Sequence, residues 1–469
     1  MGEEAEPLRF GTSGIRGVVG QGITEDGCWC AGRALGTLLG QGARVCLGRD
    51  TRLSGPAVAG WVVRGLLESG MDVVDFGIIP TPALAALTRA GGYAAGVMLT
   101  ASHNPPEYNG IKLFDGEGVG FSRIREQRIE ELVARRDFSS GHGCFTYDCS
   151  ALEGYLATLP PGVVRAAVAA KVPLLLDPGN GAAAGFARTV FERLGLPVKA
   201  VNDEPDGNFP GRGPEPAACT LCQTCEAFET SGARLCACYD GDADRVVFCD
   251  PAGFIGLDEM VAFVASMYLR GRTRGTLATT VETGLLPDLA LRRVGGRVVR
   301  GQVGDVAVAH LVREVDAALG AETVGVYIFP EQGLYPDSLL ATLHVCAMLG
   351  EGASIRGFVN SLPRLHLTRR KVDCPNSLKS SIMSRAAQLL PDALHLPAQG
   401  TLNTTDGLRI EMPDAWVLVR PSGTEPVVRV SAEAVDQKQA LLLAADAGDI
   451  VTRLINEAAP PAGTEGGSA

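Results

Sequence analysis

Short apolar runs alternate with stretches of helical periodicity along the first three quarters of the chain. Residues 44–48 (RVCLG), 71–77 (MDVVDFG) and 94–99 (AAGVML) have the length and apolar character of buried strands. Residues 57–68, between the first two runs, have the apolar spacing of a helix. This alternation predicts parallel sheets joined by crossover helices.

The same rhythm returns twice before the pattern changes. A second series predicts strands and a helix at 172–177 (VPLLLD), 186–195 (FARTVFERLG), 197–201 (PVKAV) and 234–239 (RLCACY). A third series comprises 276–281 (TLATTV), 285–295 (LLPDLALRRVG), 296–304 (GRVVRGQVG) and the segment around 322–329 (ETVGVYIF). From about residue 365, the strand patterns LHLTRRKVDC, LRIEM, AWVLVRPSG and VVRVSAEA, with a helix near 377–390, predict a smaller α+β domain. We therefore expect α/β domains at 1–148, 149–251 and 252–364, an α+β domain at 365–456 and a disordered tail at 457–469.

Composition narrows the class of protein. A chain of 469 residues is too long for one ordinary domain, and 46% hydrophobic residues allow several cores. The net charge of -11 argues against a nucleic-acid-binding surface, although cations gathered in a cleft can still bind an anionic small molecule. Because there is no signal peptide and no run of about 18 apolar residues, we expect a cytoplasmic protein without a membrane partner.

The chain contains 13 cysteines, which we expect to be reduced thiols in that compartment. Cys219, Cys222 and Cys225 have CxxCxxC spacing but no clear fourth ligand. Buried or half-buried thiols are therefore a better interpretation than a zinc or iron–sulfur site.

Ser102 follows the strand predicted at 94–99, in the turn-rich segment TASHNPPEYNGIKLF. His103 and Lys112 flank it, so Ser102 is a candidate nucleophile, which we expect to be exposed on a loop. The alternative is a serine that only caps a turn or a helix.

Three carboxylates follow the strand predicted at 234–239. Asp240, Asp242 and Asp244 are spaced i, i+2, i+4, which in an extended segment places them on the same side. They would repel one another without a cation, and hard oxygen ligands suit Mg²⁺. The alternatives are a solvated acidic turn or a calcium loop, which would lack its usual glycine and distal glutamate.

In the last domain, residues 420–426 (RPSGTEP) follow an apolar strand. The arginine, the two hydroxyls and the backbone N–H groups that the glycine leaves accessible could together bind a phosphate dianion. An ordinary Pro-Ser-Gly turn would leave Arg420 and both hydroxyls unexplained.

In this order, the segments TASHNPPEYNGIK, DGDADR and RPSGTEP resemble the α-D-phosphohexomutase superfamily. The resemblance covers nearly the whole chain and includes FGTSGIRG (10–17), GRDTRLSG (48–55), PDGNFPGRGPEP (205–216) and VGD (303–305). The forms ASHNPPEYNGIKL and YIFPEQ are most similar to the archaeal-type phosphoglucosamine mutases.

The resemblance implies a heart-shaped molecule of three similar α/β domains and a fourth domain that closes over a central cleft. It also implies that a hexose 6-phosphate and a hexose 1-phosphate interconvert through a 1,6-bisphosphate, with a bisphosphosugar as primer. We expect the protein to be a monomer or a homodimer whose partner is a sugar phosphate. Ser102 would be the phosphoserine and, with Asp240, Asp242 and Asp244, a ligand of one Mg²⁺. Arg245 would contact the phosphoryl group, and Arg16, His103 and Lys112 would act in or near proton transfer. The unreactive phosphate would be held by Arg420, Ser422, Gly423, Thr424 and Arg429.

The sugar-recognition loop departs from the family pattern Gly-Glu-x-Ser-Gly. The best register is 321–325 (AETVG), which makes Glu322, Thr323 and Gly325 substrate-binding residues but puts Val324 in place of the serine. A register centred on Glu331 in PEQG is the alternative. We expect glucosamine phosphate as the substrate, with mannose or glucose phosphates as alternatives and a metal-dependent sugar phosphatase or an inactive binding relative as further hypotheses.

Overall fold

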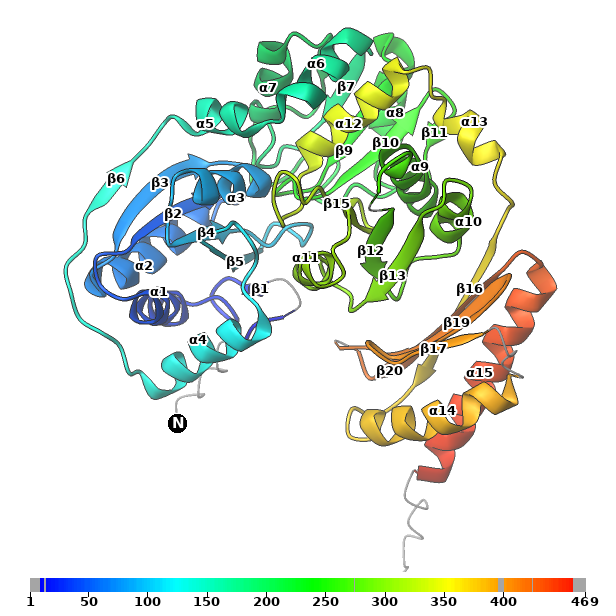
Figure 1. The fold of residues 1–469 in the computed structure, drawn as a ribbon. Coiled ribbons are helices and arrows are strands. Elements are labelled where there is room, and N and C mark those ends of the chain that lie inside the picture. Colours follow the sequence, from blue (N-terminus) through cyan, green and yellow to red (C-terminus); the bar gives the residue numbers. More distant parts are fainter. Residues whose placement is uncertain (1–8, 12–13, 274, 395–399, 424, 459–469) are drawn as a thin grey trace, which may run out of the picture.

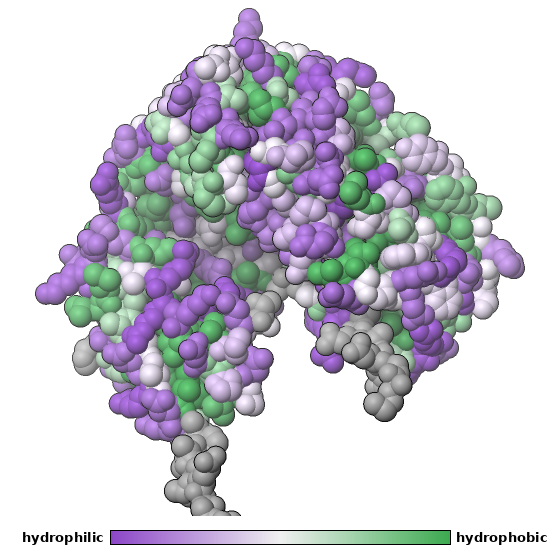
Figure 2. Space-filling view, turned by 180° about the vertical axis from the view of Figure 1, so that it is seen from behind, coloured by the Kyte–Doolittle hydropathy of each residue, from purple (hydrophilic) through white to green (hydrophobic). Residues whose placement is uncertain are grey.

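Four sheets follow one another along the chain in the computed structural model, which describes residues 9–11, 14–273, 275–394, 400–423 and 425–458. The chain forms an arch in which the first and the fourth sheet lie on opposite arms (Figure 1). From behind, the surface is hollowed between these arms (Figure 2). The predicted four-domain α/β architecture around a central cleft is confirmed, while the boundaries near 149, 252 and 365 stay predictions.

The first domain is built on a six-stranded sheet with strand order β1-β5-β4-β2-β3-β6. Its elements are β1 (Ile15–Val18), α1 (Glu25–Leu39), β2 (Arg44–Arg49), α2 (Gly55–Glu68), β3 (Asp72–Ile78), α3 (Thr81–Ala90), β4 (Ala95–Leu99), β5 (Tyr108–Asp115), α4 (Arg123–Arg135) and β6 (Phe145–Tyr147). Thr24 caps α1 by accepting a hydrogen bond from the backbone N of Gly27. β2, β3 and β4 are parallel, whereas β5 runs antiparallel to β4 and β1. The sheet is therefore mixed, and Lys112 lies on β5 rather than on a loop.

The second domain has a five-stranded sheet with strand order β11-β10-β9-β7-β8. Its elements are α5 (Ala151–Thr158), α6 (Pro161–Ala170), β7 (Leu174–Asp177), α7 (Phe186–Leu194), β8 (Val198–Ala200), α8 (Cys222–Ser231), β9 (Leu235–Tyr239), β10 (Val246–Asp250) and β11 (Gly253–Phe254). β10 reverses onto β9, with Val246 opposite Tyr239. The DGDADR segment makes this reversal, so the extended segment assumed for the aspartates is wrong: they lie on a tight turn.

The third domain has a four-stranded sheet with strand order β13-β12-β14-β15. Its elements are α9 (Leu257–Leu269), β12 (Thr276–Thr280), α10 (Leu286–Arg292), β13 (Arg297–Gly301), α11 (Asp305–Glu314), β14 (Leu319–Glu322), β15 (Val326–Ile328), α12 (Ser338–Gly350) and α13 (Ile355–Asn360). α12 packs against α6 of the second domain. Phe76, Phe191 and Phe263, one from each of the first three domains, belong to one continuous apolar core.

The fourth domain has an antiparallel sheet with strand order β16-β20-β19-β18-β17. Its elements are β16 (His366–Asp373), α14 (Lys379–Ala393), β17 (Thr401–Asn403), β18 (Leu408–Met412), β19 (Ala415–Pro421), β20 (Val427–Ala434) and α15 (Gln437–Ala458). It has a core of its own and meets the third domain through a small apolar cluster of Val281, Leu285, Trp416 and Leu418.

The helix α15 has 22 residues and includes the first two positions of the predicted tail. The tail therefore does not begin at 457, and residues 459–469 lie outside the described residues. Within the described ranges, none of the helices has both the length and the apolar character that a membrane crossing requires.

Candidate active site

Ser102 lies three residues beyond the end of β4, where the polypeptide turns sharply. Its φ of 51° falls in the left-handed region, which residues other than glycine seldom adopt. Its side chain is fully buried, so the expectation of an exposed serine is wrong. The Oγ atom donates to Asp240 Oδ2 at 2.7 Å and lies 3.2 Å from His103 Nδ1. Ser102 of the first domain thus contacts the DGDADR turn of the second domain.

A buried arginine holds the Ser102 loop in this conformation. Arg52 is fully buried and donates to the carbonyl oxygens of Ser102 at 2.9 Å and Asn104 at 2.7 Å. Its Nε donates to Asp50 Oδ2 at 2.9 Å, and the same oxygen accepts from Thr100 Oγ1 at 2.6 Å. Sequence reasoning missed both residues. GRDTRLSG begins in the last residues of β2, the parallel neighbour of β4, and continues past its carboxyl end, so the rule that ligand sites lie at strand carboxyl ends would have found Arg52 and Asp50.

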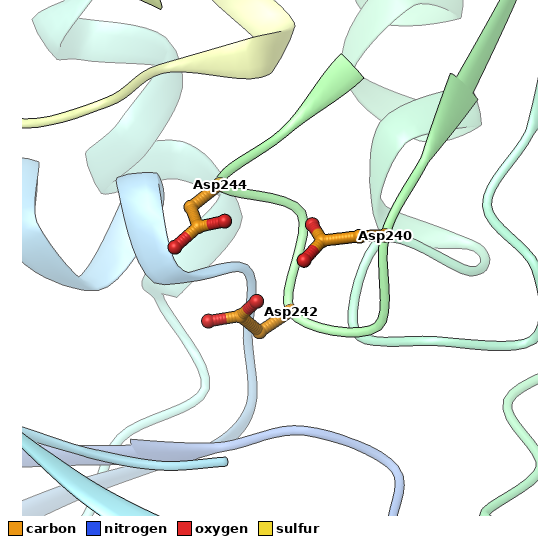
Figure 3. A group of neighbouring side chains, drawn as sticks. All are labelled: Asp240, Asp242 and Asp244. Atoms are coloured by element: carbon orange, nitrogen blue, oxygen red, sulfur yellow. The ribbon is translucent and has the colours of Figure 1, made fainter. Parts of the chain in front are cut away.

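Asp240, Asp242 and Asp244 converge in the turn between β9 and β10 (Figure 3). Each offers a carboxylate oxygen within 4.8 Å of the others, and all three side chains are buried. Lys112 Nζ donates to Asp242 at 2.7 Å and to Asp244 at 2.6 Å, and Thr81 donates to Asp242 at 2.6 Å. Within the described structure, the Oδ1 atoms of Asp242 and Asp244 have no hydrogen-bond partner. Buried carboxylate oxygens without partners are suitable ligands for a hard cation.

The serine loop and the aspartate turn approach each other backbone to backbone. A Cβ atom on Gly241 would lie 2.4 Å from the carbonyl oxygen of Ser102. Behind it, a Cβ atom on Gly181 would lie 2.5 Å from the carbonyl oxygen of Gly241. Only glycine fits at 241, because any side chain would push the two loops apart.

Burial and mutual repulsion shift the pKa values of the three aspartates. For Asp240, burial and then the charges of Asp244 and Asp242 raise the pKa well above its ordinary value. Burial also raises the pKa of Asp244, with Asp242 as the next cause. For Asp242, burial acts in the same direction, but Lys112 and the Thr81 hydroxyl outweigh it and the pKa is lowered. Lys112 and Arg245 therefore leave the pKa values of Asp240 and Asp244 raised, and a divalent cation would balance the remaining negative charge.

His103 is held in its neutral form. Burial, followed by the positive charges of Arg245 and Arg16, lowers its pKa to about 3. Its Nε2 lies 3.7 Å from Glu215 Oε2, although burial raises the pKa of that carboxyl too. Sequence reasoning assigned no role to Glu215, which belongs to the PDGNFPGRGPEP segment.

Two arginines complete this cluster. Arg16 on β1 donates from Nη1 to Asn104 Oδ1 at 3.2 Å, beside the serine loop. The backbone N of Arg245 donates to Asp240 Oδ1 at 3.2 Å, and its guanidinium lies 3.8 Å from Asp244 Oδ1. The structure therefore brings together Ser102, His103, Lys112, Arg16, Arg245 and the three aspartates, as expected from the sequence.

Glu322 lies at the end of β14 and is buried. Its Oε1 accepts from the backbone N of Gly304 at 2.9 Å, and burial followed by the charge of Asp305 raises its pKa to about 7. Beyond it, Thr323 is half-buried, Val324 is exposed, and Gly325 turns back through its N–H to the Glu322 carbonyl oxygen at 3.2 Å.

Glu331, the alternative sugar-binding residue, is not buried as Glu322 is. The side chain of Glu331 is 70% exposed and forms an ion pair with Arg272 at 2.5 Å on the surface of the third domain. Glu322, in contrast, is close enough to Arg245 and Asp244 for their charges to affect its pKa. These positions favour the register with Glu322.

The expected phosphate clamp lies on the fourth domain. Arg420 Nε donates to Asp406 Oδ1 at 2.8 Å, and its Nη1 donates to Glu282 Oε1 at 3.0 Å. Arg429 lies opposite Arg420 on β20. Ser422 is buried, Gly423 has open space beside it, and Thr424 lies outside the described residues. A cavity of about 590 Å³ beside this sheet is lined by Arg369, Lys371, Arg420, Arg429 and Glu282, among others.

The cysteine motif is not drawn together into a cluster of metal-ligating side chains in the described structure. All 13 cysteines lie in the described part of the chain and are free thiols. Cys219 and Cys222 are exposed, so the expectation of buried or half-buried thiols is wrong for these two, whereas Cys225 is half-buried against Cys249. Among the described residues, the cluster of metal-ligating side chains is the one formed by the three aspartates.

Models of all four domains of the phosphoglucomutase/phosphomannomutase family match the chain in order, at residues 7–140, 153–253, 257–365 and 371–449. The chain belongs to this family. This phosphohexomutase is 38% identical to a probable phosphoglucosamine mutase from Methanopyrus kandleri over 96% of this chain and 98% of that protein.

Solved structures share the fold of this phosphohexomutase. A phosphoglucomutase/phosphomannomutase family protein from Burkholderia thailandensis superposes with a TM-score of 0.81 at 27% identity, covering 96% of this chain and 98% of that one. An Aspergillus fumigatus N-acetylphosphoglucosamine mutase, solved with GlcNAc-6P and magnesium, has a TM-score of 0.57 at 19% identity, with 96% of each chain covered.

Proposed function

We propose that this phosphohexomutase interconverts glucosamine 6-phosphate and glucosamine 1-phosphate through a phosphorylated Ser102. The observation that carries the proposal is the hydrogen bond of 2.7 Å between Ser102 Oγ and Asp240, in a buried carboxylate cluster with two oxygens that have no hydrogen-bond partner in the described structure. The choice of glucosamine is supported by the name of the M. kandleri relative. Glucose or mannose phosphate is the alternative, because the family name covers both activities.

The donor set fits one Mg²⁺ per chain. Asp240, Asp242 and Asp244 would hold it together with the phosphorylated Ser102. All of these ligands are hard oxygens, and Mg²⁺ characteristically combines a few carboxylates with phosphate oxygens. When bound, the cation offsets the charge that spreads over the transferring phosphoryl oxygens.

The remaining chemistry falls to the side chains around Ser102. The bond between Ser102 Oγ and phosphorus breaks while the free hydroxyl of the sugar monophosphate forms a new bond to the same phosphorus. Neutral His103, with Nδ1 3.2 Å from Ser102 Oγ, would exchange the proton that moves from the hydroxyl to Oγ, and Lys112, which donates to Asp242, would act near this transfer. Arg245 and Arg16 provide positive charge beside the developing negative charge. The product of this step is a 1,6-bisphosphosugar.

The other side of the cleft binds the part of the substrate that does not react. Arg420, Ser422, Gly423, Thr424 and Arg429 would hold the distant phosphate, and Glu322 would accept hydrogen bonds from ring hydroxyls. The bisphosphate turns over, its other phosphate returns to Ser102, and the clamp then holds the new monophosphate. A bisphosphosugar primer phosphorylates Ser102 initially. We also propose that the enzyme is cytoplasmic and a monomer or homodimer.

A phosphatase would use the same serine and metal but transfer the phosphoryl group to water. Such an enzyme has no need for a second phosphate site, and the arginine-lined cavity of the fourth domain argues against it. An inactive relative is suggested only by Val324 in the sugar loop. The intact cluster around Ser102 argues against that hypothesis.

A coupled assay with the 6-phosphates of glucosamine, mannose and glucose, each with its matching 1,6-bisphosphate, tests the proposal. We expect the highest kcat/KM with glucosamine 6-phosphate and little release of inorganic phosphate. Release of inorganic phosphate at the rate of substrate loss would identify a phosphatase. A higher kcat/KM for mannose or glucose 6-phosphate would correct the substrate.

A further inference from the structure

Glu282 is an acidic side chain in a cavity whose other charged lining residues in the described structure are cationic. It follows β12 of the third domain and faces the sheet of the fourth. Among the charged side chains that line this cavity in the described part of the chain, Glu282 is the one carboxylate; the others are Arg369, Arg370, Lys371, Arg420 and Arg429. A carboxylate in the lining of a site repels a bound phosphate dianion, so the position of Glu282 calls for an explanation beyond phosphate binding.

The backbone around Glu282 is fixed before any ligand binds. Val281 is fully buried, and its carbonyl oxygen accepts from Arg409 Nη1 of the fourth domain at 2.7 Å. The N–H of Glu282 donates to Thr280 Oγ1 at 3.3 Å. The side chain is 44% exposed and reaches Arg420 Nη1 at 3.0 Å. Its carboxylate is therefore held next to the guanidinium that is expected to bind phosphate.

A phosphate on Arg420 would lie within a few ångströms of this carboxylate, and like charges at that distance repel each other. The repulsion is relieved if the ligand itself carries a cation at this point. Glucosamine phosphate has an ammonium group on C2, and C2 is bonded to C1. When the 1-phosphate occupies the clamp, the ammonium lies beside Glu282. When the 6-phosphate occupies the clamp, C2 lies on the other side of the ring.

We propose that Glu282 determines specificity for amino sugars by binding the C2 ammonium of glucosamine 1-phosphate, an inference that rests on the proposed mutase function. Glucose and mannose 1-phosphates bring a neutral hydroxyl to the same place. They offer the carboxylate no cationic group of their own next to their phosphate, and the mismatch discriminates against them. Glu282 thus recognises the amino group only when the sugar is bound with its 1-phosphate in the clamp.

Replacing Glu282 by glutamine tests the proposal, because the variant keeps the shape and removes the charge. In Glu282→Gln, we expect the ratio of kcat/KM for glucosamine 1-phosphate over glucose 1-phosphate to fall about ten-fold or more, mainly through KM. The KM for glucosamine 6-phosphate should change less. Glu425→Gln is the matched control, since Glu425 pairs with Lys371 and Arg429 on the same sheet face. It should shift both sugars in the same direction and leave the ratio unchanged.

An unchanged ratio in Glu282→Gln, or an equal change of ratio in Glu425→Gln, would overturn the proposal. Titration calorimetry separates this failure from a failure of the mutase function, because it needs no turnover. Glucosamine 1-phosphate should bind about ten-fold or more weakly to Ser102→Ala/Glu282→Gln than to Ser102→Ala, and glucose 1-phosphate should not. Equal affinities of both proteins for glucosamine 1-phosphate would refute the role of Glu282. Absence of turnover with every sugar phosphate would refute the mutase.

Discussion

The two sides of the cleft hold their charged side chains in opposite ways. In the cluster around Ser102, the charged side chains are nearly fully buried: they are those of Lys112 and of its partners Asp242 and Asp244. In the clamp, the Arg420 side chain is 21% exposed and pairs with Asp406 and Glu282, which belong to other segments. Buried groups must be satisfied before the substrate arrives, whereas exposed ion pairs are worth only about 0–1 kcal/mol and exchange partners easily.

This difference corresponds to two kinds of task. Transfer of a phosphoryl group depends on preorganised charges, because reorganisation during the reaction would raise the barrier. A clamp must bind a phosphate, release it and bind another in every turnover. Carboxylates that form ion pairs with Arg420 between these events keep its side chain in place without burying it. Changes in the buried cluster should therefore damage the reaction itself, and changes in the clamp should mainly affect binding.

The largest effect is expected for Ser102→Ala, which removes the atom that carries the phosphoryl group. Turnover should be abolished, while the thermal unfolding midpoint should stay close to that of the wild type because the backbone contacts of the loop remain. Intact-mass measurement should show a phosphorylated fraction only in the wild type. Ser122→Ala, at a helix cap without a side-chain hydrogen bond, is the control and should be fully active. Activity in Ser102→Ala would exclude the phosphoserine mechanism.

Asp242→Asn should lower turnover about 100-fold or more at limiting Mg²⁺, because it removes a charged ligand from a site with few ligands. A chelator should silence the wild type, and added Mg²⁺ should restore it. Asp250→Asn is the matched control, since Asp250 lies at the far end of β10 and pairs with Arg356. An enzyme that is indifferent to chelator would mean that the aspartates do not bind a metal needed for activity.

Arg420→Ala should raise KM about ten-fold or more and change kcat less, because one charge-assisted contact to the phosphate is lost. Arg385→Ala, which breaks an exposed pair with Glu457 elsewhere in the same domain, should leave both constants unchanged. Equal KM values for Arg420→Ala and the wild type would remove the fourth domain from substrate binding.

The smallest effect distinguishes the two possible sugar loops. Glu322→Gln should lower kcat/KM about three-fold to ten-fold for all three sugars, since neutral hydrogen bonds replace charged ones at ring hydroxyls. Glu331→Gln, on the surface, should be silent. The opposite result would place the sugar loop in PEQG.

Much of this arrangement could be predicted from local patterns. Each reactive segment directly follows a strand with a clear apolar run, and parallel strands place their carboxyl ends on one edge of a sheet. That rule brings Ser102 and the aspartates to neighbouring sheet edges. The actual contact between them depends on Gly241, whose missing side chain allows the two loops to meet.

Other features depend on partners that are distant in the sequence. Lys112 is buried on β5 because Asp242 and Asp244, about 130 residues away, compensate for the desolvation of its charge. No local pattern predicts a buried lysine, so the segment around it looked like a loop. Glu282 is equally inconspicuous in TTVETG, and its place beside Arg420 follows only from the packing of the fourth domain on the third.

The separate core of the fourth domain also bears on how such enzymes can be recombined. A chimera that exchanged the first or second domain would have to rebuild an apolar interior shared by three units. The fourth domain can be exchanged with fewer adjustments, since its apolar contact with the third is the small cluster around Trp416 and Leu418. A donated fourth domain would bring a new clamp to an unaltered phosphoserine, while Glu282 and Glu322, which we expect to select the sugar, would stay with the third domain.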